Sequence, residues 1–142
     1  MDHIVYVDAK AKAMELLISK EKRMIIRGAA GRITPYGRVE IGDTLFFINN
    51  NGEGLVKAKG VVSEVFNSQK MIKEESAKLV RENQEKLRLS KSQLNKFAGK
   101  KYIILVTVDN VERIEPFGID KTDYGKMDNW LCVEDIERVK VK

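Results

Sequence analysis

Cysteine and histidine are nearly absent from this chain of 142 residues, which contains one of each. Cys132 has no second cysteine for an internal disulfide, so we expect a buried thiol in a reducing compartment and a cytoplasmic location. With His3 as the single histidine, neither a zinc site ligated by histidine nor a histidine-based catalytic dyad can be assembled. The sequence therefore indicates no metal site and no cofactor.

Long apolar runs are also missing. No stretch approaches the roughly 18 residues of a membrane span, and we expect neither a signal peptide nor a membrane partner. A chain of this length can bury about two-thirds of its unfolded surface. No repeat, low-complexity linker or composition change divides it, so we expect a single domain over residues 1–142. The sequence gives no indication of oligomeric state.

Positive charge is concentrated in one segment. The chain has a net charge of +5, and residues 20–38 alone carry six Lys or Arg against one Glu. Residues 111–137 instead hold eight carboxylates against three cations. A basic segment together with a separate acidic one indicates a localised binding site for an anionic partner, rather than non-specific binding over the whole surface. The six cations are Lys20, Lys22, Arg23, Arg27, Arg32 and Arg38.

The basic segment has features of a site for RNA or a nucleotide. A glycine-containing loop follows a short β-like run at residues 24–27, and Tyr36 lies between Arg32 and Arg38. Cations can hold phosphates, and an aromatic ring beside them can stack on a base. We therefore predict that Tyr36 and the six cations bind RNA or a nucleoside ligand. A solvated basic loop is the alternative.

Hydrophobic periodicity predicts strands with helices inserted between them. We predict helices over residues 9–19, after a cap at Asp8, over 73–87, and from a capping box at Ser90 to Gly99. Strands are predicted at 24–27, 44–48, 55–66 and 101–108, the last continuing into 111–114 past a bulge at residues 109–110, with an edge strand at 136–141. Residues 49–54 predict a hairpin, and Gly60 a bend. This order indicates an α+β domain with a small, mostly antiparallel β-barrel.

Three segments resemble the ASCH family of the PUA-like superfamily. Residues 18–27 resemble the family's N-terminal signature, in which a helix ends in a Gly-x-Lys-x-x-x-x-Arg type motif. Residues 42–47 resemble its Gly-Asp strand entry, and residues 102–106 with 111–114 its late strand pair. The resemblance implies a five- or six-stranded PUA-like barrel with flanking helices. It also implies an RNA- or nucleotide-binding cleft beside the motif lysine.

The resemblance assigns roles to individual residues. Lys22 falls on the motif lysine and Arg27 on its arginine. One branch of the family removes acyl groups from N4-acylated cytidines and another cleaves RNA, and in an enzyme of this kind Lys22 would be the catalytic base. Ile25 stands where the deacylating branch has a threonine, so Thr34, Tyr36 or a residue elsewhere in the chain would have to supply a hydroxyl nucleophile. Lys20 replaces the motif glycine.

Three functions follow from these observations. The first is a module that binds RNA or a modified nucleoside in a basic cleft. The second is a small hydrolase that acts on an acylated cytidine or on RNA. The third is a regulatory adaptor whose Arg32 and Arg38 meet an acidic protein surface.

Overall fold

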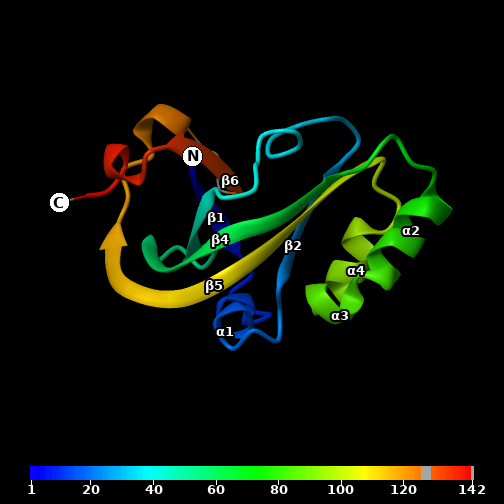
Figure 1. Ribbon diagram of the computed structural model, residues 1–142, viewed down its shortest axis with the longest axis horizontal. Coiled ribbons are helices and arrows are strands. Elements are labelled where there is room, and N and C mark those ends of the chain that lie inside the picture. Colours follow the sequence, from blue (N-terminus) through cyan, green and yellow to red (C-terminus); the bar gives the residue numbers. More distant parts are fainter. Residues whose placement is uncertain (126–128, 142) are drawn as a thin grey trace.

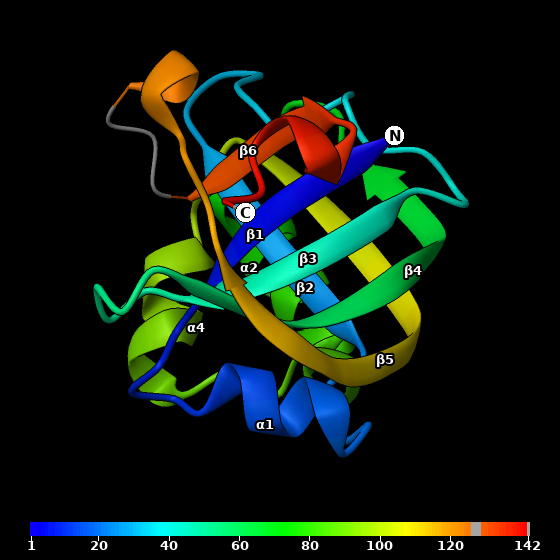
Figure 2. The same cartoon turned by 90° about the vertical axis from the view of Figure 1, so that its left-hand side faces the viewer.

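A six-stranded sheet forms the centre of the computed structural model, which describes residues 1–125 and 129–141. The sheet curls into a half-barrel with the strand order β2-β5-β4-β3-β1-β6 (Figures 1 and 2). The α+β fold with a barrel-like, mostly antiparallel sheet predicted from the sequence is thus confirmed. The strands are β1 (Asp2–Val7), β2 (Met24–Ala29), β3 (Thr44–Asn49), β4 (Leu55–Asn67), β5 (Tyr102–Gly118) and β6 (Trp130–Glu134).

The two longest strands produce the curl. β4 has 13 residues and β5 has 17, and their antiparallel pairing is interrupted by three register shifts. One shift falls at Gly60, where a Cβ atom would lie 2.9 Å from Val111 Cγ2. The predicted bend at Gly60 therefore coincides with an irregularity that a side chain would crowd. The predicted continuation of the strand at 101–108 into 111–114 is confirmed, because both segments belong to β5.

The first strand was not predicted from the sequence, although residues 3–7 are mostly apolar. β1 pairs parallel to β3 and antiparallel to β6, which makes the sheet mixed. His3, Ile4 and Val5 are fully buried within it. Cys132 on β6 is partly buried and packs against the core, and burial raises the pKa of its thiol.

Helix α1 (Ala13–Ile18) closes one end of the half-barrel (Figure 2). It buries Met14 and Leu17 in the core. The predicted helix at 9–19 is wrong in its first four residues, which form turns. Asp8 accepts a hydrogen bond from the Ala11 amide there, and Lys12 has a left-handed backbone with φ 56°. The helix therefore begins after Lys12, not after the expected cap at Asp8.

Three short helices cover the outer face of β2 and β5 (Figure 1). They are α2 (Lys73–Glu82), α3 (Gln84–Leu87) and α4 (Lys91–Phe97). The predicted single helix at 73–87 is wrong, because the helix is interrupted at Asn83, between α2 and α3. The side-chain amide of Asn83 donates a hydrogen bond to the Leu79 carbonyl at 2.9 Å. The predicted capping box of Ser90 and Gln93 is confirmed.

The C-terminal edge strand predicted at 136–141 is wrong. The Asp135 carboxylate accepts a hydrogen bond from the Glu137 amide and starts a 3-10 turn at Ile136–Arg138. Lys140 then forms an isolated bridge with Ile119. Another 3-10 turn lies at Thr122–Tyr124. None of the described helices is long and apolar enough to cross a membrane.

Candidate functional site

Arg27 ties β2 to β1 across the open side of the sheet. Its Nη2 donates to the Tyr6 carbonyl on β1, and its Nη1 donates to the Ile26 carbonyl at 2.8 Å. The guanidinium lies 5.6 Å from the centre of the Trp130 ring, which is itself buried. No strand pairing joins β2 to β1 or β6 among the described residues, so the Arg27 side chain bridges this gap.

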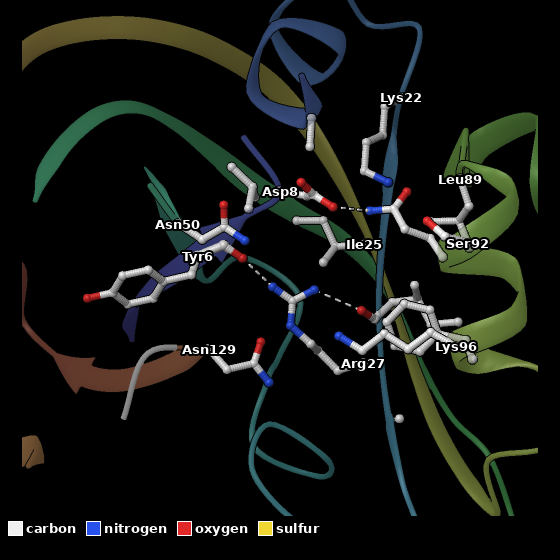
Figure 3. Close-up of a pocket in the computed structure, with 16 residues that line it drawn as sticks. Tyr6, Asp8, Lys22, Ile25, Arg27, Asn50, Leu89, Ser92, Lys96 and Asn129 are labelled. Atoms are coloured by element: carbon white, nitrogen blue, oxygen red, sulfur yellow. Dashed lines mark hydrogen bonds between the residues drawn. The ribbon is translucent and has the colours of Figure 1, made fainter. Parts of the chain in front are cut away.

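A cavity of about 700 Å³ opens at this seam between β2, the end of β1 and α4 (Figure 3). Its volume falls within the roughly 300–1,000 Å³ of typical small-molecule sites. Ile25, Leu89 and Phe97 give it an apolar part, while the polar side chains come from several elements. The polar and charged residues that line it are Tyr6, Asp8, Lys22, Arg27, Asn50, Ser92, Gln93, Lys96 and Asn129.

Lys22 is buried in the wall of this cavity, with 7% of its surface exposed. It lies two residues before β2, and its Nζ donates to the Leu87 carbonyl at the end of α3. Burial, and secondly the nearby charge of Arg27, lower the pKa of Lys22 to about 8. At neutral pH the lysine is therefore mostly charged but close to the range in which it can act as a base.

Arg27 is also desolvated. Burial lowers the pKa of Arg27 to about 10, and its Nε is buried without a hydrogen-bond partner among the described residues. Neither Arg27 nor Lys22 forms an ion pair with a described carboxylate. Asp8, the one carboxylate among the described residues of the lining, accepts from the Ala11 amide and from Gln93 Nε2 at 3.1 Å. Two cations thus line the cavity without a paired negative charge from the part of the chain that the structure describes.

The other predicted site residues do not line this cavity, although Lys22 shares a second cavity with two of them and Arg27 shares a third with Tyr36. Lys20 and Arg23 line a smaller cavity of about 190 Å³ beyond Lys22, and Arg23 Nη2 lies 3.8 Å from Glu85 Oε1. Arg32 and Arg38 are exposed, and Arg38 lines none of the cavities described here.

Tyr36 lies at a neighbouring small cavity, where its hydroxyl donates to the Ser68 carbonyl. Its ring meets the Tyr102 ring edge-on at 5.7 Å, and Arg32 lies over both rings at 5.9 and 5.3 Å. The hydroxyls proposed from the sequence, on Thr34 and Tyr36, therefore do not line the cavity of Lys22. Ser92 of α4 places a hydroxyl-bearing side chain in that lining instead.

Several lining residues were assigned only structural roles from the sequence. Asp8 was predicted as a helix cap, Gln93 falls in the predicted capping box of Ser90, and residues 49–54 were predicted as a hairpin. Asn50 does line the cavity, with its side-chain oxygen accepting from the Ala9 amide at 3.0 Å. No group of three or more His, Cys, Asp or Glu side chains in the described ranges is arranged to hold a metal ion.

Comparison with solved structures identifies the fold. No family model and no curated protein sequence matches this chain. The crystal structure of ASCH from Zymomonas mobilis matches it with a TM-score of 0.65 and 11% identity, over 94% of this chain and 89% of that chain. The chain has the fold of an ASCH domain.

Two single-substitution variants of the same ASCH protein give similar matches. The variant with a tyrosine replaced by phenylalanine has a TM-score of 0.67, and the one with a serine replaced by alanine 0.68. Both are 12% identical and cover 96% of this chain, and 94% and 92% of their own chains respectively. The ASCH fold implied by the three sequence motifs is confirmed, although sequence identity is very low.

Proposed function

We propose that this ASCH-fold protein binds RNA or a modified nucleoside, with one nucleotide held in the cavity between β2, β1 and α4. The observation that carries this proposal is the pair of desolvated cations, Lys22 and Arg27, which line the cavity without an ion-paired carboxylate. A buried charge that has only neutral hydrogen-bond partners is unfavourable, and a phosphate would supply a counter-charge, while a base edge would supply further acceptors.

The remainder of the lining fits a nucleotide. Ile25, Leu89 and Phe97 offer apolar contact, while the amides of Asn50 and Asn129 can donate and accept hydrogen bonds. Lys96 stands beside the cavity on α4 (Figure 3) and supplies a third cation. Apolar walls with a few polar groups are typical of small-ligand sites.

The proposal is tested by titrating a labelled six-nucleotide single-stranded RNA at two salt concentrations and following its fluorescence anisotropy. We expect salt-dependent binding by the wild type and at least tenfold weaker binding by Lys22→Met, which keeps the length of the buried side chain. Lys78→Ala on α2 is the matched control, because Lys78 is exposed and outside the cavity. Equal affinities for wild type and Lys22→Met would refute the proposal.

A second candidate, hydrolysis of an acylated nucleoside, is favoured by the pKa of Lys22. A lysine with a pKa of about 8 can accept a proton from a hydroxyl near neutral pH, and Ser92 is a hydroxyl-bearing residue of the same cavity. Ile25 supplies none, since its side chain is apolar and 2% exposed. For the adaptor hypothesis, no contact of Arg32 or Arg38 among the described residues gives specific support.

A further inference from the structure

Lys22 is the only buried lysine among the described residues, and it lines a cavity large enough for a small molecule. We propose that its amine is a nucleophile, which forms an imine with a small aldehyde or ketone that carries a carboxylate or a phosphate. This covalent activity goes beyond the proposed binding of RNA or a nucleoside. Its support comes from the position of the amine, from its contacts and from the cation beside it.

Lys22 reaches the cavity from surroundings that are partly apolar. It has 7% of its surface exposed and lines the cavity together with Ile25 and Leu89. In Figure 3 its side chain points into the cavity. Desolvation disfavours an ammonium group, so this position favours the neutral amine. The cavity at the same time gives a small molecule access to the buried nitrogen.

The contacts of the Lys22 amine leave its nitrogen lone pair available. Nζ donates a hydrogen bond to the Leu87 carbonyl, which uses an N–H and not the lone pair. No described carboxylate forms an ion pair with it. The nearby hydroxyl of Ser92 lies 3.2 Å from the Ser90 hydroxyl, and no hydroxyl in the described ranges is hydrogen-bonded to Lys22. The amine is therefore free to attack a carbonyl carbon itself.

Arg27 activates this amine. Burial, and secondly the charge of Arg27, lower the pKa of Lys22 to about 8. A lysine that is desolvated and lies near another cation is an established kind of activated nucleophile. At about pH 7.5 roughly a quarter of a lysine with this pKa is the free amine, against about a thousandth of an ordinary lysine.

Arg27 also selects an anionic partner. It lines the same cavity as Lys22, and its Nε is buried without a hydrogen-bond partner among the described residues. A carboxylate or a phosphate on the carbonyl compound can accept a hydrogen bond from this guanidinium and supply a counter-charge. The imine becomes a cation when it is protonated, which is unfavourable near Arg27 unless the bound molecule carries a negative charge.

Imine formation at Lys22 needs no reactant besides the carbonyl compound. The Lys22 nitrogen bonds to the carbonyl carbon, and the bond between this carbon and its oxygen breaks. Both hydrogens of the neutral amine leave with that oxygen as water. Nothing is oxidised or reduced, so the step requires neither a metal nor a redox partner.

Reductive trapping in the wild-type protein tests this proposal. The probes are para-formylbenzoate and para-formylbenzamide, which present an aldehyde with and without a negative charge. Sodium cyanoborohydride converts an imine into a stable secondary amine, and peptide mass mapping then gives the labelling rate at each lysine. Lys96 is the matched internal control, because it lines the same cavity but is exposed. Lys78 on α2 is an exposed control outside the cavity.

We expect para-formylbenzoate to label Lys22 at least about tenfold faster than Lys96 or Lys78 near neutral pH. This factor is smaller than the difference in free amine because a less basic amine is a weaker nucleophile. With para-formylbenzamide the preference for Lys22 over Lys78 should be at least about threefold smaller. Lys22→Met should lose the fast site and keep the slow labelling of Lys96 and Lys78.

Labelling of Lys22 no faster than that of Lys96 would overturn the proposal, as would an equal preference for Lys22 with both probes. The wild-type comparison needs no variant, so it holds even if Lys22→Met fails to fold. No nucleic acid enters this assay. A negative result here therefore leaves the proposed RNA binding standing, and a negative RNA titration leaves the imine chemistry standing.

Discussion

Lys22 and Arg27 enter the same cavity from one short stretch of chain, and the positive charge of Arg27 lowers the pKa of Lys22. Lys22 lies just before β2 and Arg27 within it. The protein therefore holds two desolvated cations, and the charge of Arg27 disfavours the charged form of Lys22. The negative charge of an anionic ligand near both side chains would offset the cost of their desolvation and the effect of Arg27 on Lys22, which is the physical basis of the proposed site.

The burial of Lys22 should appear in the pH dependence of stability. Between pH 8 and 10.5 an unfolded lysine still holds the proton that the folded Lys22 has released, so its contribution to the free energy of unfolding rises with pH. Relative to Lys22→Met, the wild type should gain roughly 2–3 kcal/mol between pH 7 and 10. Urea unfolding of both proteins at the two pH values measures this, and a constant difference would contradict it.

Arg27→Lys should weaken the contact between β2 and β1 while keeping the positive charge. A lysine cannot present the planar fork that reaches the Tyr6 and Ile26 carbonyls together. The loss of one or both hydrogen bonds should lower the free energy of unfolding by about 1–3 kcal/mol. Denaturant unfolding at pH 7 gives the change, with Arg23→Lys as the exposed control on the same segment. Unchanged stability would mean that Arg27 does not bridge β2 and β1.

His3 should make the protein less stable below pH 6.5. Its Nε2 lies 2.8 Å from Asp43 Oδ2, and its Nδ1 accepts from Trp130 Nε1 at 3.0 Å. Since an indole N–H only donates, this arrangement requires an unprotonated Nδ1. Burial lowers the pKa of His3, against the opposing effect of Asp43.

The unfolded chain therefore binds a proton in a pH range where the folded chain does not. The free energy of unfolding should fall with decreasing pH below 6.5, by at most about 1.4 kcal/mol per pH unit from this group. His3→Leu should show a flatter profile between pH 6.5 and 5. Unfolding curves across this range provide the test, and parallel profiles would exclude His3 as the source of the effect.

Turnover distinguishes the hydrolase from the binding module. The purified protein incubated with N4-acetylcytidine should release no acetate if it only binds. If acetate is released, Lys22→Met and Ser92→Ala should each abolish release, whereas Thr34→Ala should not, because Thr34 lies outside the Lys22 cavity. Activity that survives Ser92→Ala would exclude Ser92 as the nucleophile.

The sheet was largely predictable because its strands have local signals. The hairpin at 49–54, the apolar run at 101–108 and the capping box at Ser90 were each visible in a few consecutive residues, and the structure contains all three. β1 was missed because its six residues carry no turn or alternation signal and its partners, β3 and β6, are distant in sequence. Parallel pairing of this kind depends on tertiary contacts.

The cavity was predictable only in part, because its walls come from segments that are distant in sequence. The charge of residues 20–38 and the motif spacing predicted Lys22 and Arg27 as binding residues, and both line one cavity. The opposite wall comes from the ends of β1 and β3 and from α4. In the sequence, these segments were predicted only as helix caps and a turn. Nothing local in the sequence indicates that Asp8 and Gln93 meet, because 85 residues separate them.

The pKa of Lys22 with and without ligand tests the central claim most directly. NMR titration of the lysine side chains, with Lys22 assigned from the Lys22→Met spectrum, gives this value in the free protein and in the presence of a saturating six-nucleotide RNA. If the RNA places an anionic group against Lys22, its pKa should rise from about 8 towards the ordinary 10.5. A pKa that stays near 8 when RNA is bound would place the RNA elsewhere and contradict the account.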